Sequence, residues 1–210
     1  MSEFYPLLTR RAKYVGTPKV YGYGRFRAEI SEDCQYRCVY CDTHQTDIGG
    51  SPTMELDHLR PESKFARLAD DPSNLVYSCR SCNRLKRDDW PAGEHECCWV
   101  DKEGYVHPFE NDRRKFFRLG RGGEVETLQA PAAYVARRLG LNRPLLKRLR
   151  LRALLVIEAK AQLAIVIAQI EARLNASPAS PDAETLKFCL ATLRNQILLL
   201  DFFTARKGID

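Results

Sequence analysis

The clearest hydrophobic pattern lies in the last third of the chain, where apolar residues recur at steps of three and four. This spacing predicts one apolar face on a helix over about 182–205. An earlier apolar stretch begins after Asn142, a helix-capping residue, and Pro144, which suits a first turn, and it predicts a helix to about residue 174. Residues 175–181, rich in Ser, Pro and Ala, join the two and predict an antiparallel helical hairpin. The apolar stripe consists of Leu186, Leu190, Leu193, Ile197 and Leu200.

The first of these helices is apolar enough to raise the question of a membrane span. Its most apolar section, residues 153–170, contains two charged side chains, Glu158 and Lys160, and two amides, Gln162 and Gln169. Charged groups inside the hydrocarbon region of a bilayer are costly and rare. The sequence therefore predicts that this helix does not cross a membrane.

The central region alternates between short apolar segments and loops rich in turn-forming residues. Residues 54–59 alternate apolar and polar side chains and end before Pro61, which predicts a strand. Residues 75–77 predict a second short strand, and residues 81–88 predict a helix directly after it. Another short helix is predicted earlier, over residues 25–36.

The composition is that of a soluble globular chain, with 44% hydrophobic and 29% charged residues among 210. The formal net charge of +6 is compatible with a polyanionic partner but does not require one. The distribution of charge is more informative. Residues 53–104 carry eight basic and eleven acidic side chains, which favours cations, whereas residues 128–152 carry seven basic side chains and no acidic one, which favours phosphate.

Four of the eight cysteines form two Cys-x-x-Cys pairs, Cys38 with Cys41 and Cys79 with Cys82. Four thiolates are the ligand set of a closed structural zinc site. A disulfide scaffold is the alternative that the cysteine count leaves open. The start of the chain has no basic residue followed by an apolar run, so we predict no signal peptide and a reducing, cytoplasmic compartment.

The remaining cysteines near these pairs are predicted to be free thiols. Cys34 is expected to be buried without binding metal. Cys97 and Cys98 are adjacent and cannot easily chelate one ion, so they are expected in the core, within a hairpin formed by residues 97–100 and 104–106. The less favoured alternative is a second metal site built from His95, Cys97 and His107.

Between the two cysteine pairs lie Asp57-His58 and, farther on, Asn74-Leu-Val, and the second pair continues into Asn83 and Lys86. This order of motifs resembles the HNH endonucleases that have a ββα-metal core on a zinc-bound scaffold. The resemblance covers about residues 25–90. It implies an α+β fold in which a small zinc-stabilised ββα-metal core is followed, in this chain, by a mainly α-helical C-terminal extension.

The resemblance also implies that His58, Asp57, Asn74 and Asn83 are the catalytic residues. An imidazole can accept a proton from water at neutral pH, so His58 is the expected general base. Asp57 and Asn83 offer oxygen ligands, which suit a hard catalytic ion such as Mg²⁺ or Mn²⁺. Asn74 is expected to brace the loop and orient the histidine, and a plain turn asparagine is the alternative. The zinc has no open coordination position and is expected to be structural.

Two groups of basic residues are candidates for contact with the DNA backbone, which would carry no sequence information. A solvated surface is the alternative for both groups, and a partner-facing surface is a further alternative for the second. The first group lies on or beside the predicted metal helix and consists of Arg80, Arg84, Lys86 and Arg87. The second surrounds the turn at Gly140, which follows a short helix predicted from about residue 130, and includes Arg137, Arg138, Lys147 and Arg148.

We therefore predict four regions: an N-terminal arm at 1–24, a nuclease core at 25–90, a connecting region at 91–127, and a helical domain or hairpin at 128–210. The arm interleaves tyrosines with basic residues, which is typical of a nucleic-acid arm and also of a segment packed on the surface. The predicted function is metal-dependent hydrolysis of DNA phosphodiester bonds by a histidine-activated water and one divalent ion.

The alternative function is a non-catalytic zinc-containing module that binds nucleic acid or protein. Small HNH proteins occur in bacterial anti-phage systems, so the resemblance implies defence as one setting. The C-terminal helices are a candidate surface for a protein partner or for a homo-oligomer.

Overall fold

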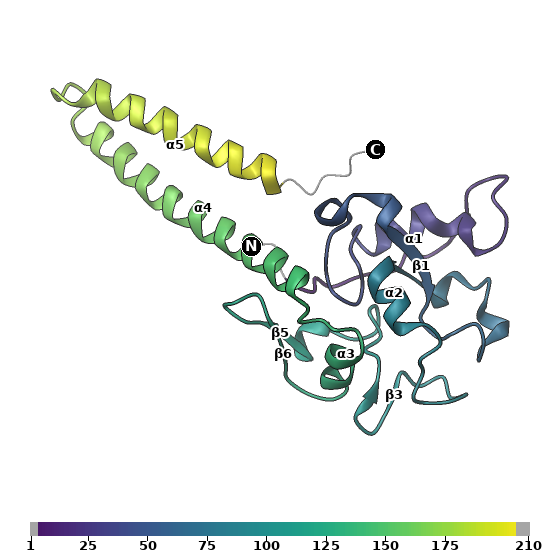
Figure 1. The fold of residues 1–210 in the computed structure, drawn as a ribbon. Coiled ribbons are helices and arrows are strands. Elements are labelled where there is room, and N and C mark those ends of the chain that lie inside the picture. Colours follow the sequence, from purple (N-terminus) through teal and green to yellow (C-terminus); the bar gives the residue numbers. More distant parts are fainter. Residues whose placement is uncertain (1–3, 205–210) are drawn as a thin grey trace. The chain divides into compact units, whose positions relative to one another are not determined.

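The computed structural model describes residues 4–204 of the 210-residue chain, with side chains as far as residue 200. The described residues form two compact units, residues 4–149 and residues 150–204. The first unit contains the strands and the shorter helices, and the second consists of two long helical segments (Figure 1). The division falls inside helix α4 (Pro144–Ala176).

Two strands and a helix form the centre of the first unit. Strand β1 (Met54–His58) pairs with strand β2 (Leu75–Cys79) in antiparallel register, with Met54 opposite Cys79. Helix α2 (Arg80–Lys86) follows β2 directly and uses Cys79 as its N-cap. The predicted order of two short strands and a helix is confirmed, as is the α+β class. Strand β2 continues past residue 77 because it pairs with the whole length of β1.

Short helical turns surround this centre. Helix α1 (Arg27–Asp33) follows the 3-10 turn η1 (Tyr23–Phe26). It ends before the predicted boundary at residue 36 because Gln35 and Tyr36 have φ angles of 53° and 55°, which do not continue a right-handed helix. The loops on either side of β1 contain four further 3-10 turns, η2 (Gln45–Ile48), η3 (Ser51–Thr53), η4 (Ala66–Leu68) and η5 (Pro72–Asn74).

The beginning of the N-terminal arm packs on the first unit. The side chain of Tyr5 is buried. Arg10 donates hydrogen bonds to the backbone oxygens of Ser73 at 2.7 Å and Leu75 at 2.9 Å. Arg10 is therefore held by the protein rather than presented to phosphate. Farther along the arm, Tyr21 is exposed.

Two small hairpins follow α2, of which the sequence predicts one. Strand β3 (Trp99–Val100) pairs with β4 (Glu103–Gly104), as expected. Strand β5 (Phe117–Leu119) follows the 3-10 turn η6 (Arg113–Lys115) and pairs with β6 (Val125–Thr127). The second hairpin is not predicted, because strands of three residues are too short to show a periodicity.

The free-thiol predictions differ in outcome. Cys34 and Cys98 are buried, as expected, whereas Cys97 is exposed, so its predicted place in the core is wrong. Within residues 4–200 no second metal-ligand cluster is found; His107 is buried, whereas Cys97 is exposed.

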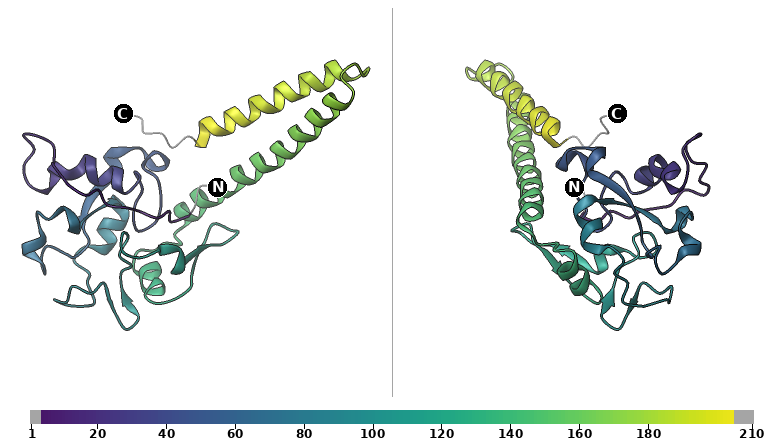
Figure 2. Two further views of the ribbon diagram at one scale, coloured as in Figure 1. Left: turned by 180° about the vertical axis from the view of Figure 1, so that it is seen from behind. Right: turned by 45° about the vertical axis from the view of Figure 1, so that its right-hand side comes forward.

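Helix α3 (Ala132–Arg138) precedes α4, and helix α5 (Ala183–Thr204) follows it. Within the second unit, α4 and α5 lie side by side and run antiparallel in all three views (Figures 1 and 2), which confirms the predicted hairpin. Glu171 pairs with Arg194 at 2.7 Å, and Arg173 pairs with Asp182. The residues of the predicted apolar stripe on α5 are half-buried, as the seam of such a hairpin requires.

In the described part of the chain, α4 is the one helix with the length and composition of a membrane span, with a mean hydropathy of 1.8 over its most apolar stretch. None of that stretch is buried. An apolar helix of this length is equally able to face another protein surface, and Glu158 and Lys160 lie in its apolar section. That the helix does not cross a membrane stays a prediction.

Candidate functional site

The four cysteines of the two pairs come together in the structure. The sulfur atoms of Cys38, Cys41, Cys79 and Cys82 all lie within 4.8 Å of one another, and the four side chains are buried. The sulfurs of Cys41 and Cys79 are 3.9 Å apart, close to the edge of about 3.8 Å for a tetrahedron with Zn–S bonds of about 2.3 Å. None of the four forms a disulfide bond. The cluster therefore fits one structural zinc ion with no open position.

Local backbone geometry builds each half of this cluster. In the first half, Asp42 has a φ angle of 60°, and its amide donates to the carbonyl of Cys38, which closes a tight turn. In the second half, Cys79 ends β2 and caps α2, and its sulfur accepts a hydrogen bond from the amide of Cys82 at 3.4 Å. The strand end and the first helical turn thus hold the second pair of thiols together.

His58 lies at the end of β1, with its side chain 11% exposed. Its Nε2 is 2.8 Å from the backbone oxygen of Ala69. A carbonyl oxygen only accepts, so Nε2 carries the proton and Nδ1 keeps its lone pair in the neutral ring. Nδ1 faces the carboxylate of Glu62 at 4.0 Å, and the ring of Tyr23 meets the imidazole edge-on with 4.7 Å between centroids. The structure thus presents a histidine with a defined tautomer and one basic nitrogen.

Asn74 is buried and clamps the chain that follows His58. Its Oδ1 accepts a hydrogen bond from the amide of Arg60, and its Nδ2 donates to the carbonyl of Arg60, both at 2.9 Å. Nδ2 also donates to the carbonyl of Leu68 at 3.4 Å, next to the residue whose carbonyl holds His58. Asn74 therefore fixes the two segments that border the imidazole, and it does so through backbone groups.

Asp57 is buried, and both of its carboxylate oxygens have partners. The hydroxyl of Tyr40 donates to Oδ2 at 2.5 Å, and the ammonium of Lys86 lies 3.3 Å from Oδ1. Lys86 is fully buried and also donates to the backbone oxygen of His58 at 2.8 Å. Burial raises the pKa of Asp57 above its ordinary value, and the Lys86 charge opposes this shift. The ion pair anchors the strand end that carries the histidine.

Asn83 lies one helical turn before Lys86 and faces a different carboxylate, that of Glu55. Its Nδ2 donates to Glu55 Oε2 at 2.8 Å, and Arg80 pairs with Oε1 at 3.0 Å. Partial burial raises the pKa of Glu55, but the hydrogen bond from Asn83 and the charge of Arg80 outweigh it, so the pKa is lowered. Glu55 and Asp57 are two residues apart on β1, so both face α2.

The predicted metal ligands have the type of ligand atom that a hard cation prefers, since Asp57 and Asn83 both offer side-chain oxygens where β1 meets α2. In the structure each of them has its own partner, Lys86 for Asp57 and Glu55 for Asn83. The sequence predicts neither partner. The alternation along β1 places Glu55 on the same face as Asp57, so the sequence contains a signal for Glu55 as a site residue. No local pattern marks Lys86, Tyr40 or Tyr23 as neighbours of the site.

The candidate DNA-contacting residues differ in their surroundings. Lys86 is fully buried and paired, so its predicted contact with phosphate is wrong, because it has no exposed surface to offer. Arg80 pairs with Glu55. Arg137 and Arg138 pair with Glu103 at 3.9 Å and Asp89 at 3.4 Å, although no acidic residue lies near them in sequence. Within residues 4–200, the candidates without an ion pair are Arg84, Arg87, Lys147 and Arg148.

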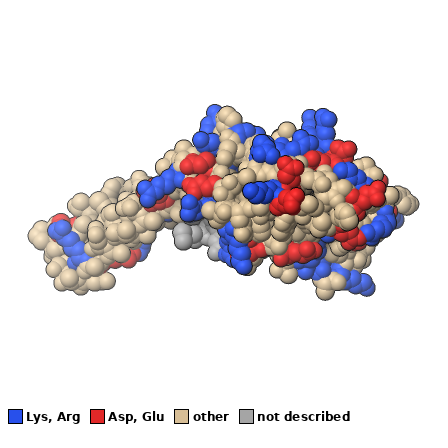
Figure 3. Space-filling view, turned by 90° about the horizontal axis from the view of Figure 1, so that it is seen from below, with Lys and Arg blue, Asp and Glu red and all other residues tan. Residues whose placement is uncertain are grey.

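Acidic and basic groups are interspersed on the face shown in Figure 3, which carries no continuous surface of one sign. Contact with a polyanion would therefore depend on individual side chains rather than on a broad positive field.

Replacement of Lys86 by methionine is expected to lower the free energy of unfolding by about 3 kcal/mol, because it leaves a buried carboxylate without its partner. Urea unfolding followed by circular dichroism, with zinc present, measures the change. Lys102→Met is the matched control, since Lys102 is exposed. An unfolding midpoint equal to that of the wild type would show that the ion pair with Asp57 contributes nothing to stability.

Comparison with known families bears on the same segment. Residues 38–89 match the family model described as HNH endonuclease. The matched segment begins at the first cysteine of the cluster and ends just after α2, so it contains β1, β2 and α2. The search of curated proteins gave no match. The family match, the ββα arrangement and the four-cysteine cluster together show that this chain contains an HNH endonuclease domain at residues 38–89.

Proposed function

We propose that the protein is a metal-dependent endonuclease that hydrolyses DNA phosphodiester bonds with a water molecule activated by His58. The observation that supports this most directly is the state of the imidazole. Its Nε2–H is held by the carbonyl of Ala69, which leaves the lone pair of Nδ1 to accept a proton. The water oxygen would attack phosphorus while its proton passes to Nδ1, and the bond from phosphorus to the leaving oxygen would break.

The residues around His58 would act by positioning it. Asn74 fixes the two backbone segments beside the ring. The ring of Tyr23 is in T-shaped contact with the imidazole and limits its rotation. The carboxylate of Glu62 lies 4.0 Å from Nδ1, on the side of the ring where the proton would be taken.

A divalent cation such as Mg²⁺ or Mn²⁺ is part of the proposal. Asp57 and Asn83 would hold it, and Glu55 also lies where β1 meets α2. When bound, the ion supplies positive charge to the scissile phosphate and the leaving oxygen. The zinc at the four cysteines would hold the fold and take no part in the reaction, because four thiolates leave it no open position.

The test is cleavage of a supercoiled plasmid by the purified zinc-loaded protein. Nicked or linear DNA is expected with Mg²⁺ or Mn²⁺ and none with excess EDTA, which strips the more weakly held catalytic ion. Zinc content measured after the EDTA treatment shows that the structural site is still filled. Cleavage that continues unchanged in EDTA would contradict a hard-cation mechanism.

Replacement of Asn83 by alanine is expected to raise the Mg²⁺ concentration needed for half-maximal cleavage by about tenfold or more, because it removes an oxygen ligand and the partner of Glu55. A metal titration of the plasmid assay measures the shift. Asn142→Ala is not a suitable control for this substitution, because the Asn142 side chain hydrogen-bonds to the backbone of Val125. The exposed Asn175 offers the matched control. An unchanged requirement in Asn83→Ala would remove this residue from the metal site.

Reversal of charge at Lys147 and Arg148 is expected to weaken DNA binding about equally for all sequences. Each phosphate contact contributes roughly −0.9 to the slope of log K against log salt, so loss of both should flatten that slope by about 1.8. Binding isotherms at several salt concentrations, in the His58→Ala background, measure it. Equal slopes in the variant and its parent would instead favour a partner-facing role for these side chains.

The second candidate function is a non-catalytic zinc module that binds nucleic acid or protein. One observation favours it: the carboxylate of Asp57 is already bonded to Tyr40 and Lys86, so the structure does not present it to a cation. DNA binding without cleavage under every metal condition would support this alternative.

The proposed setting is a reducing compartment such as the cytoplasm, since the cysteine cluster requires free thiols. A place in an anti-phage defence system rests on the resemblance alone and stays a prediction. The outer face of the helical hairpin is the proposed surface for a protein partner or a second copy of the chain. Its exposed apolar side chains include Leu155, Ile165, Phe188 and Leu198.

A further inference from the structure

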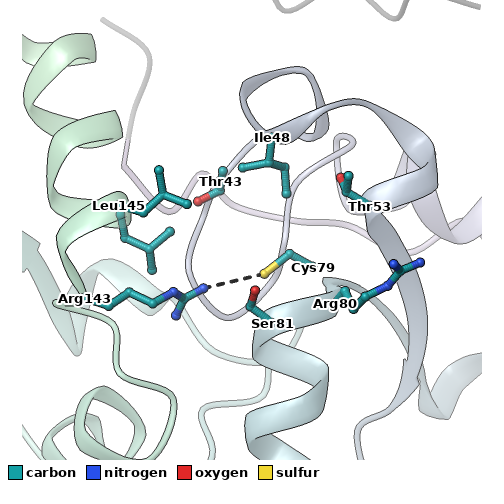
Figure 4. A pocket seen from close by; sticks show the side chains of 9 residues that line it. Thr43, Ile48, Thr53, Cys79, Arg80, Ser81, Arg143 and Leu145 are labelled. Atoms are coloured by element: carbon teal, nitrogen blue, oxygen red, sulfur yellow. Dashed lines mark hydrogen bonds between the residues drawn. The ribbon is translucent and has the colours of Figure 1, made fainter.

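Arg143, one of the seven basic side chains of residues 128–152, points inward to the cysteine cluster. Its Nη2 lies 3.7 Å from the sulfur of Cys82 and 3.9 Å from the sulfur of Cys79, within hydrogen-bonding reach of both. Figure 4 shows the guanidinium of Arg143, the residue before α4, extending toward Cys79. Arg143 and Cys79 both line a pocket of about 260 Å³. The contact joins residues 61 and 64 positions apart in the sequence.

The guanidinium is held in this place by backbone groups on its other side. Its Nη1 donates to the carbonyl of Leu139 at 2.9 Å and to that of Gly140 at 3.4 Å. These carbonyls belong to the end of α3 and the turn after it, where Gly140 adopts a φ angle of 54°. One nitrogen therefore anchors the side chain to the turn, and the other faces the thiols. A lysine ammonium carries its donors on one nitrogen, so it spans the two sites less well than the planar guanidinium, whose donors lie on separate nitrogens.

The charge of a zinc-loaded cluster explains why a guanidinium at this place is favourable. A zinc ion with four thiolate ligands carries a net charge of about −2. The four cysteines are buried, and an uncompensated buried charge is unfavourable. N–H donors to the ligand atoms of a metal site stabilise the charged ligands and orient them. Arg143 supplies both a positive charge and such donors to one side of the cluster.

We propose that Arg143 is a positioning residue of the zinc site, which neutralises part of its charge and holds the thiolates of Cys79 and Cys82 in place. The proposal ties the turn between α3 and α4 to the stability of the nuclease core. It also removes Arg143 from the basic side chains that could meet DNA. Zinc retention can be measured without DNA, so the proposal is tested independently of cleavage.

The experiment compares zinc-loaded wild-type protein with Arg143→Gln in competition with a chromophoric zinc chelator. The zinc affinity of Arg143→Gln is expected to fall by about 10–100-fold, the usual effect of removing an outer partner of a metal ligand. Arg143→Lys is expected to give an intermediate loss. Arg121→Gln is the matched control, because Arg121 is an exposed arginine in the turn between β5 and β6, and it should retain zinc as the wild type does.

A second measurement separates this role from a general loosening of the fold. Alkylation by N-ethylmaleimide, mapped by mass spectrometry on the zinc-bound proteins, should accelerate at Cys79 and Cys82 more than at Cys38 and Cys41. Equal zinc affinity in wild type and Arg143→Gln, or equal acceleration at all four cysteines, would overturn the proposal. If Arg143→Gln does not fold, the zinc affinity of Arg143→Lys tests the proposal instead. An affinity of Arg143→Lys equal to that of the wild type would overturn the proposal.

Discussion

Replacement of His58 by alanine is expected to slow plasmid cleavage by a factor of about 10²–10⁴, the usual contribution of a general base. The imidazole is the group whose Nδ1 would take the proton from water, and alanine offers no substitute. The backbone of residue 58 should keep its place, because Lys86 bonds its carbonyl oxygen rather than its side chain. Initial rates of nicking at saturating metal, with equal zinc content in both proteins, measure the loss.

The chain offers a matched control in His95, an exposed histidine outside β1 and α2. His95→Ala should cleave at the wild-type rate. Duplex binding by His58→Ala should remain close to that of the wild type, since the proposed role of the imidazole lies in the chemical step rather than in phosphate neutralisation. A His58→Ala protein that nicks plasmid as fast as the wild type would mean that the proposed general base is wrong.

Replacement of Cys82 by serine is expected to cause loss of the bound zinc and unfolding of the first unit. Structural zinc contributes on the order of 10 kcal/mol to small domains of this kind, and the sulfur of Cys82 lies within 4.8 Å of the other three. A serine hydroxyl is a poor replacement for a thiolate ligand. Elemental analysis for zinc and circular dichroism of the purified proteins measure both effects.

Cys34→Ala is the control for this substitution, because Cys34 is also buried but lies outside the cluster. It should remain folded and retain one zinc per chain. A soluble and folded Cys82→Ser protein without zinc would refute the view that the metal holds the fold. The same result for the wild type would refute the zinc assignment and the role of Arg143 together.

Several features of the fold follow from local patterns in the sequence. The two Cys-x-x-Cys pairs predict the cluster, because each pair needs only a tight turn or a helix start to bring its own thiols together. The order of strand, strand and helix follows from short apolar segments bounded by loops. The hairpin of α4 and α5 follows from apolar residues at helical spacing and a proline-containing connection. These features depend on residues that are close in sequence.

The partners of the candidate catalytic residues cannot be predicted from local sequence patterns. The motif predicts that Asp57 and Asn83 share one ion, yet Asp57 pairs with Lys86, and Asn83 bonds to Glu55. Strand alternation tells which residues of β1 face α2, but it does not tell which side chains of the helix lie opposite them. That choice depends on how far α2 is shifted along β1, which is set by the packing of both elements.

The ion-pair partners of the basic residues are also set by the tertiary structure. A run without acidic neighbours in sequence predicts side chains open to phosphate, but charge pairs form through space. Asp89 lies 49 positions before Arg138 in the sequence and still pairs with it, while Arg143 turns to thiols more than 60 positions away.

The sequence by itself therefore determined the four-cysteine cluster, the ββα order and the helical hairpin, because spacing along the chain encodes them. Only the tertiary structure decided the tautomer of His58, the burial of Lys86 and the inward turn of Arg143. Each of these depends on a partner from a distant segment, such as the carbonyl of Ala69 or the sulfur of Cys82, and its position exists only once the chain has folded.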